Sequence, residues 1–273
     1  MPDTACISQK GLESIRAFVK AGGGLVALQE SSLCDEFGTR RADFGLADLY
    51  GASFGALEDH TASWPNYPNP TYVTLQTHPM FDEQVIRENY RFEGTTLDYI
   101  GMTAKVKAAP DAQVVAKRGE EPFLILSTPG KGRSAYFAAD IGQSYFVAPY
   151  PYERQLMANA LRWAAGQNHP PVTVHAPMCV QAAFYEQENG SRTVVHLLNE
   201  INTSTNRALP EGNSSMREEI VPLSGIHITF LDPHIKRVRL EPEGQTLQIR
   251  RVHDGVEVTV PELRLHSMVV AER

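Results

Sequence analysis

The sequence has few of the features that mark nucleic-acid binding or membrane insertion. Its formal net charge is -7 and its lysines and arginines form no cluster, so it lacks the concentrated basic face that phosphate backbones require. No apolar run approaches the roughly 18 residues of a membrane helix, and the first residues lack the basic and apolar regions of a signal peptide. We therefore expect a cytoplasmic protein that binds neither nucleic acid nor a membrane.

Motifs of familiar catalytic and cofactor sites are also missing. The cysteines, Cys6, Cys34 and Cys179, are odd in number and widely spaced, which argues against a disulfide framework or a CxxC metal site and predicts reduced thiols. No GxSxG nucleophile elbow is present, and Gly130–Ser134 lacks the spacing of a phosphate-binding loop. The nine histidines form no HExxH motif. We therefore expect neither a metal nor a cofactor.

What the first half does contain is an alternation of helical and strand patterns. Apolar residues recur at helical spacing between Ser8, a candidate N-cap, and Lys20, and the apolar run Leu25–Leu28 follows a group of glycines. Thr39 is predicted to cap a second helix that Gly51 closes. This alternation is typical of a parallel sheet covered by helices, in which ligands bind beyond the carboxyl ends of the strands.

The remainder of this half is predicted to hold a loop, several short strands and one helix. Residues 52–70 are rich in proline, which breaks regular structure, and should form a long loop. A helix is expected over Tyr152–Ala165, ending at Gly166. Strands are predicted at Thr71–Leu75, Thr95–Ile100, Gln113–Lys117, Pro122–Ser127 and Arg133–Ala138, with a hairpin turn at Thr128–Gly132 between the last two.

A linker follows that helix. Pro170 and Pro171 prevent the helix from continuing, so we place a domain boundary at about residue 168. Residues 1–168 are predicted to form an α/β domain and residues 169–273 an all-β sandwich, because short alternating runs and turn signals replace the helical pattern. The predicted strands are Val172–His175, Val180–Glu186, Thr193–Asn199, Ile226–Phe230, Val238–Glu241, Leu247–Arg251, Val256–Val260 and His266–Val270.

The loop that follows the first predicted strand is the candidate ligand site. It runs from Glu30 to Asp35 and offers two carboxylates, two hydroxyls and a thiol, with Arg41 close behind. Glu30, Asp35 and Arg41 are our ligand-binding candidates at this site. The alternative is that the polar residues of this loop only cap and turn the backbone.

Two side chains of this loop, Ser32 and Cys34, are candidate nucleophiles. The loop leads toward a predicted helix N-terminus and two arginines, features that lower the pKa of a thiol. Either nucleophile would need a histidine as its base, and His60 and His78 are the candidates in this half. The alternative is that Cys34 is a small, partly buried apolar residue.

A second candidate surface lies in the proline-rich loop. His60 and Trp64, beside Asp59 and Tyr67, combine an aromatic face with hydrogen-bonding groups, which is typical of a sugar-binding surface. The alternative is a surface loop held by its own aromatic residues. Glycosidic chemistry would need two carboxylates about 5 to 9.5 Å apart in a cleft, and the sequence nominates no such pair.

Several segments together resemble one family. The segments that carry the resemblance are Phe18–Ala27, Ser32–Gly38, Arg41–Gly51, Gly130–Arg133, Tyr136–Gly142, Leu156–Leu161 and Val195–Asn199. All but the last resemble the β-galactosidase trimerisation domain that follows the catalytic barrel in family 42 β-galactosidases and related putative glycoside hydrolases. Val195–Asn199 resembles a strand in the C-terminal β-domain of the same enzymes.

The resemblance implies a fold and a role. The first domain would be a flavodoxin-like or class I glutamine amidotransferase-like three-layer α/β domain that lacks its first strand. The (β/α)8 barrel, which carries the catalytic glutamates in those enzymes, has no counterpart in this sequence, and neither does the amidotransferase nucleophile elbow. The resemblance therefore implies a noncatalytic rear portion of a glycoside hydrolase-like protein, which forms a dimer or trimer and shapes a carbohydrate cleft. The alternatives are a small esterase or thiol-dependent hydrolase using Ser32 or Cys34 with His60, and a carbohydrate-binding protein that depends on Trp64.

Overall fold

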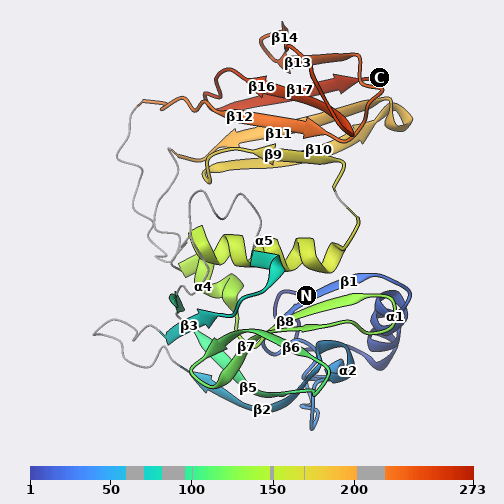
Figure 1. The fold of residues 1–273 in the computed structure, drawn as a ribbon, viewed down its shortest axis with the longest axis vertical. Coiled ribbons are helices and arrows are strands. Elements are labelled where there is room, and N and C mark those ends of the chain that lie inside the picture. Colours follow the sequence, from blue (N-terminus) through green and yellow to red (C-terminus); the bar gives the residue numbers. More distant parts are fainter. Residues whose placement is uncertain (60–70, 82–95, 100, 148–150, 169, 202–218) are drawn as a thin grey trace. The chain divides into compact units, whose positions relative to one another are not determined.

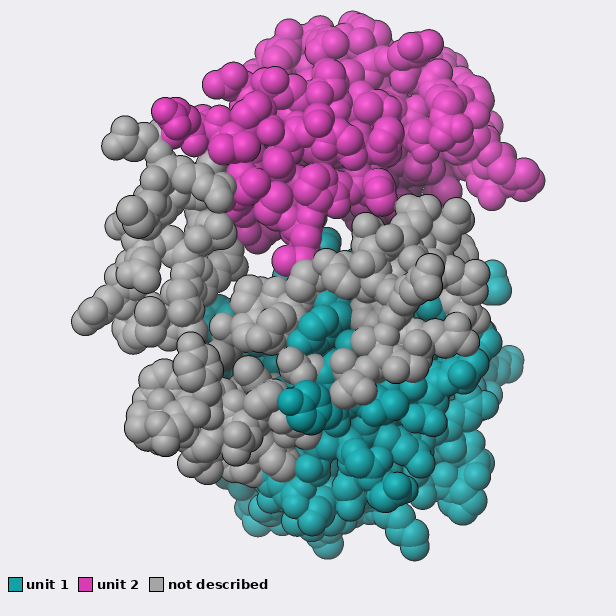
Figure 2. Space-filling model, turned by 60° about the vertical axis from the view of Figure 1, so that its left-hand side comes forward, with its two compact units in different colours: residues 1–169 teal, residues 170–273 magenta. Residues whose placement is uncertain are grey.

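The computed structural model describes residues 1–59, 71–81, 96–99, 101–147, 151–168, 170–201 and 219–273. The chain divides into two compact units, Met1–His169 and Pro170–Arg273 (Figure 2). Strands outnumber helices in both units (Figure 1).

The first unit contains the following elements. They are α1 (Gln9–Lys20), β1 (Gly24–Leu28), α2 (Ala47–Tyr50), β2 (Ala52–Asp59), β3 (Thr71–Leu75), the 3-10 helix η1 (Pro79–Phe81), β4 (Thr96–Tyr99), β5 (Met102–Ala108), β6 (Gln113–Arg118), β7 (Glu121–Ser127), β8 (Arg133–Phe137), α4 (Ile141–Val147) and α5 (Pro151–Ala165).

The main sheet of this unit is mixed, so the expectation of a parallel sheet is wrong. Its strand order is β1-β8-β7-β6-β3-β4, and among the strands described only β1 and β8 run parallel. The reason is that β6, β7 and β8 follow one another through short turns, which reverse the chain and make neighbouring strands antiparallel. The predicted hairpin between β7 and β8 is confirmed. A separate two-stranded sheet pairs β2 with β5.

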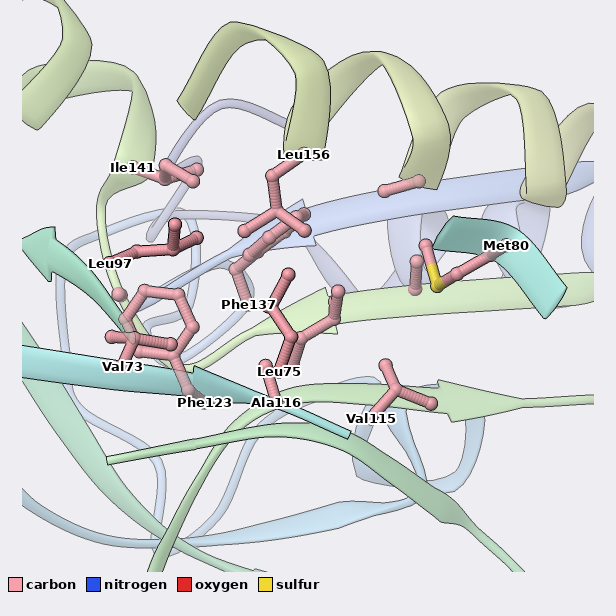
Figure 3. Packing of buried hydrophobic residues seen from close by; sticks show 14 of the residues in the cluster. Val73, Leu75, Met80, Leu97, Val115, Ala116, Phe123, Phe137, Ile141 and Leu156 are labelled. Carbon is pink, nitrogen blue, oxygen red and sulfur yellow. The ribbon is translucent and has the colours of Figure 1, made fainter. Parts of the chain in front are cut away.

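The main sheet lies between two apolar layers. One face packs against α5, whose Leu156 points into a cluster with Leu75 and Phe137 (Figure 3). The other face shares a second cluster with α1, α2 and the β2-β5 sheet. The side chains of β1 point to both faces of the sheet. Leu25 and Ala27 belong to the second cluster, and Leu28 belongs to the first. Each fully buried Leu or Phe contributes roughly 2 kcal/mol of stability, so the two clusters hold the three layers together.

Local signals explain the helices in part. The Ser8 hydroxyl accepts the Gly11 N–H and caps α1, as predicted. The prediction that Thr39 caps the next helix is wrong, because the Thr39 carbonyl instead accepts the Asp35 N–H in a turn. That helix, α2, has only four residues, although Gly51 ends it in the left-handed conformation as expected.

The first part of the predicted proline-rich loop is a strand, and residues 60–70 lie outside the described residues. Residues 52–59 form β2, which pairs with β5 and ends before the prolines begin. The sequence analysis missed α4 and also β5, although in β5 the buried Ala104 and Val106 alternate with the exposed Lys105 and Lys107.

The second unit is built from two sheets around one apolar core. The orders are β10-β11-β17-β13-β14 and β15-β16-β12-β9, and both sheets contribute to the same cluster. The elements are β9 (Val172–His175), β10 (Val180–Gln187), the 3-10 helix η2 (Glu188–Gly190), β11 (Arg192–Asn199), β12 (Ile226–Phe230), β13 (Arg237–Glu241), β14 (Gln245–Thr246), β15 (Arg250–Val252), β16 (Gly255–Val260) and β17 (His266–Glu272).

The alternation of apolar and polar residues in the sequence predicts most of these strands. In β16, Val256, Val258 and Val260 are buried while Glu257 and Thr259 face outward. The predicted strand over residues 247–251 is wrong in one respect, because β14 and β15 belong to different sheets and the chain crosses between them at residues 247–249.

Candidate functional site

The loop that follows β1 is completed by the first residues of the chain. The N–H groups of Ser32 and Cys34 donate to the carbonyls of Thr4 and Ala5 at 2.9 Å each, and the Ile7 N–H donates to the Cys34 carbonyl at 3.1 Å. Residues 1–7 therefore run alongside the loop and satisfy backbone groups that would otherwise need water.

Ser32 is enclosed in a hydrogen-bonded core. Its side chain is 0% exposed and its hydroxyl lies 3.2 Å from the Tyr50 hydroxyl and accepts the Leu46 N–H. The Tyr50 hydroxyl donates in turn to the Ser31 carbonyl at 3.1 Å. Burial raises the pKa of Tyr50, so its hydroxyl stays protonated and remains a donor. Ser32 thus links the loop to α2, and the position offers no accessible nucleophile.

Cys34 is not placed in an activating environment by the described residues. Partial burial, followed by the neighbouring Cys6 and Glu30, raises the pKa of the Cys34 thiol, whereas a reactive thiol needs a lowered pKa. The Arg41 guanidinium donates to the carbonyls of Cys34 and Ile7. The prediction of a lowered thiol pKa is therefore wrong. Arg40 does lower the pKa of Cys34, but burial, Cys6 and Glu30 outweigh its effect, and Arg41 is occupied by the backbone.

The remaining polar candidates of the loop also serve local structure. One oxygen of the Asp35 carboxylate accepts the N–H groups of Phe37 at 2.9 Å and Thr39 at 2.8 Å, and the Thr39 N–H is the main cause of the lowered pKa of Asp35. The Arg40 guanidinium lies 4.7 Å from the ring centroid of Phe54. These contacts correspond to the alternative in which the polar residues cap and turn the backbone.

Sequence reasoning nominated Glu30 but missed the two carboxylates that lie near it at the ends of β1 and β8, Asp3 and Asp140. Asp3 accepts the Glu30 N–H at 2.7 Å, and burial, with added repulsion from Asp140 and Glu30, raises the pKa of Asp3 to about 6. Asp140 follows β8 and accepts the Gln143 N–H at the start of α4. The parallel pairing of β1 with β8 brings Glu30 and Asp140 to one edge, and only that pairing could have predicted their proximity.

These carboxylates do not make a metal centre. Within the ranges that the structure describes, no group of three His, Cys, Asp or Glu side chains is arranged to hold a metal ion. The edge therefore presents negative charge without the ligand set that a cation needs.

Another buried carboxyl lies in the first turn of α5. Glu153 is 2% exposed, accepts the Ser144 hydroxyl at 2.6 Å through Oε1, and has no hydrogen-bond partner for Oε2. Burial raises the pKa of Glu153 to about 7. A carboxyl that is half protonated near neutral pH is unusual, and its surroundings are apolar side chains such as Leu156 and Phe123.

Open hollows in the second unit are lined by polar side chains. One of about 290 Å³ lies on the outer face of the four-stranded sheet, between His175, His227 and Glu257. A neighbouring hollow of about 610 Å³ shares Arg250 and Glu257 with it. In each of these hollows, and in the small cavity beside Glu153, a single carboxylate is present, whereas glycoside hydrolysis uses two.

The remaining candidates from the sequence analysis are His60, Trp64 and His78. His60 and Trp64 lie outside the described residues. His78 is described, and its Nδ1 accepts the Met80 N–H at the start of η1. No helix in the described part of the chain is long and apolar enough to cross a membrane.

Comparison with solved structures gives the class of protein that shares this fold. Glycoside hydrolases match along the whole chain, although the chain accounts for well under half of each of them. Comparison of the sequence with protein-family models gives no match, and neither does comparison with curated proteins.

The matched structures are the following enzymes. α-L-Fucosidase isoenzyme 2 from Paenibacillus thiaminolyticus aligns with a TM-score of 0.71 and 20% identity, covering 100% of this chain and 40% of the enzyme. β-Galactosidase from Bacillus circulans sp. alkalophilus aligns with a TM-score of 0.62 and 17% identity, covering 100% of this chain and 32% of the enzyme. The E323A mutant of Gan42B, a GH42 β-galactosidase from G. stearothermophilus, aligns with a TM-score of 0.59 and 13% identity, covering 100% of this chain and 31% of the enzyme. At these identities the likeness shows a shared fold, that of a segment of glycoside hydrolases.

Proposed function

We propose that this chain is a noncatalytic portion of a glycoside hydrolase-like protein that serves oligomerisation and helps to form a carbohydrate cleft. The observation that carries the proposal is the alignment of the entire chain with only 31% to 40% of three glycoside hydrolases. The absence of a second carboxylate from the hollows described above also supports it.

The finer assignment of the first unit belongs to the same proposal. We assign it to the trimerisation-type, amidotransferase-like domains. Its main sheet between two apolar layers and its parallel β1-β8 pair support this assignment. The antiparallel strands β6, β7 and β3 would then be elaborations of that fold.

An exposed aromatic side chain supports a role in oligomerisation. Phe37 is 86% exposed on a turn that the Asp35 carboxylate stabilises through two backbone N–H groups. A turn that is already ordered loses little conformational entropy on association, and aromatic side chains dominate protein interfaces. Phe37 is therefore our candidate for a subunit contact.

Sedimentation of the full chain tests the oligomer directly. We expect a dimer or trimer at micromolar concentration, a shift toward monomer in Phe37→Ala, and no shift in Phe18→Ala, which removes an equally apolar side chain that is 60% exposed on α1. A wild-type chain that sediments as a monomer at all concentrations would contradict the oligomerisation role.

Activity and binding assays test the remaining parts. We expect no turnover of nitrophenyl β-galactoside or nitrophenyl α-fucoside, and saturable galactose binding that weakens in Trp64→Ala. Glycosidase activity that disappears on mutation of one carboxylate would overturn the noncatalytic role. Esterase activity lost in Cys34→Ala or Ser32→Ala, but kept in distant surface variants, would favour the hydrolase alternative.

A further inference from the structure

Two cysteines that are far apart in the sequence face each other in the fold. Cys6 and Cys34 are directly opposed in a parallel bridge, which the hydrogen bonds from Cys34 N–H to the Ala5 carbonyl and from Ile7 N–H to the Cys34 carbonyl hold in place. The Cys6 side chain is close enough to contribute to the raised pKa of the Cys34 thiol. Both are free thiols in this structure.

The backbone spacing fits a disulfide. Adjacent paired strands lie about 4.7 to 4.9 Å apart, and residues that oppose each other across a bridge project their side chains to the same face. Disulfides join residues whose Cα atoms are about 4.4 to 6.8 Å apart. The bridge therefore brings Cys6 and Cys34 into the range for cross-linking without a rearrangement of the loop.

The two thiols differ in access. Cys6 is exposed, whereas Cys34 is half-buried. A reagent in solution would therefore meet Cys6 first, and Cys34 would be the neighbour that attacks next. Cys179, in the second unit, has no cysteine partner in the chain described here and serves as an internal comparison.

We propose that Cys6 and Cys34 form a reversible intramolecular disulfide on exposure to a low-molecular-weight disulfide. The Cys6 thiolate attacks one sulfur of the small disulfide, and one small thiol leaves with the electron pair of the broken bond. The Cys34 thiolate then attacks the Cys6 sulfur and expels the second small thiol. Overall two protein thiols are oxidised by two electrons and one small disulfide is reduced to two thiols.

The cross-link would fasten residues 1–7 to the loop after β1. It closes a loop that contains α1 and β1, so it limits the freedom of the unfolded chain. Amide hydrogens of residues 4–7 and 31–35 should then exchange at least about tenfold more slowly, since even short closed loops restrict opening to that degree. A thiol reductant should restore the original exchange rates.

Mass spectrometry of the full chain treated with oxidised glutathione tests the proposal. We expect a peptide pair joined through Cys6 and Cys34, with the loss of two hydrogens, and a separate glutathione adduct at Cys179. In Cys34→Ser the reaction should stop at a glutathione adduct on Cys6, and Cys179→Ser should leave the cross-link unaffected.

Two results would overturn the proposal. One is wild-type protein in which Cys6 carries a stable glutathione adduct while Cys34 remains alkylatable. The other is protein in which both thiols stay free under conditions that modify Cys179. Hydrogen exchange of residues 31–35 that is unchanged in cross-linked protein would refute the fastening of the loop.

Discussion

The cores of the two units differ in what they bury. In the second unit, the buried polar side chains among the described residues are Asn199 and Ser267, and the core is otherwise aliphatic and aromatic. The first unit buries many more of them: Gln29, Ser31, Ser32, Thr103, Ser134, Ser144, Glu153 and Asn159. Buried polar groups must find specific partners, so the first unit depends on hydrogen-bond geometry in addition to apolar packing, whereas the second depends mainly on packing.

The same contrast holds for unsatisfied groups. In the first unit, buried polar atoms without a partner include the Gln29 amide nitrogen and one oxygen of Glu153. In the second unit the described cases are the Nε atoms of Arg192 and Arg239, whose guanidinium groups also bond Glu272. The first unit therefore gives up stability at individual buried sites, and those sites are where function or regulation can act.

The largest expected effect tests whether the two cores are independent. Leu124 and Leu197 are both 0% exposed, one in each unit, and truncation to alanine should cost about 2 to 5 kcal/mol. Calorimetry should show two transitions, with Leu124→Ala lowering one and Leu197→Ala lowering the other. A single transition that both variants lower equally would contradict the separation into two stability units.

The next effect concerns Glu153 and its dependence on pH. Its folded-state pKa of about 7 lies above the usual value of 4.5 for a glutamate, so folding favours the protonated form. The folded state is therefore most stable below pH 4.5 with respect to this group, and that stability is lost as pH rises through 7. Glu153→Gln should raise the free energy of unfolding at pH 8 by about 1 to 3 kcal/mol.

Denaturant titrations between pH 5 and pH 8 give the measurement for this prediction. The wild-type stability should fall with rising pH more steeply than that of Glu153→Gln. Asp3, whose pKa is about 6, adds a slope of the same sign in both proteins. Glu257→Gln, which alters an outward-facing carboxylate of the second unit, is the control and should leave the slope unchanged. Parallel slopes for wild type and Glu153→Gln would refute the assignment.

A third prediction compares two buried polar side chains, Ser32 in the first unit and Asn199 in the second. The Asn199 amide donates to the carbonyls of Val221 and Arg264, and the Ser32 hydroxyl accepts the Leu46 N–H. Alanine in place of Ser32 removes the acceptor of the buried Leu46 N–H, and alanine in place of Asn199 removes two hydrogen bonds from a buried amide, so each should cost about 1 to 3 kcal/mol. Equilibrium unfolding monitored separately for each unit measures both values. Losses below about 0.5 kcal/mol would mean that water replaces the lost partners.

The smallest effects are expected at exposed ion pairs. Arg250, whose side chain is 68% exposed, pairs with Glu257 in the second unit, and Lys105, 48% exposed, pairs with Glu58 in the first. Solvent screens both pairs, so Arg250→Ala and Lys105→Ala should each leave the free energy of unfolding almost unchanged. Double-mutant cycles at low and high salt measure the coupling. A coupling that persists in high salt would show that the pair is effectively buried.

Sequence patterns located most strands of both units, but they predicted the arrangement of the strands better in the second unit than in the first. Period-two alternation placed β9 and β12 at their observed bounds, because each strand has one buried and one outward face. In the first unit the same reasoning located β1 and α5 but assigned the wrong sheet direction. Strand direction depends on which distant segments pair, and local periodicity carries no information about that choice.

The candidate loop shows the same limit. Residue types nominated Ser32 and Cys34, yet Ser32 is buried against Tyr50 and Cys34 lies beside Cys6. Those partners come from other parts of the chain, so no spacing within the loop could indicate them. Asp3 was overlooked because residues 1–7 carry no periodic pattern of their own.

The pairing of residues 1–7 with the loop also protects an open side of the main sheet. β1 is an edge strand of the main sheet and pairs with β8. The Leu28 N–H, at the end of β1, donates to the Met1 carbonyl, and the Ser32 N–H, in the loop that follows, donates to the Thr4 carbonyl. Unpaired N–H groups along a strand can template the addition of another chain. Residues 1–7 thus cover the edge of β1 and oppose strand-to-strand aggregation. We expect their proteolytic removal to make the protein self-associate through β1.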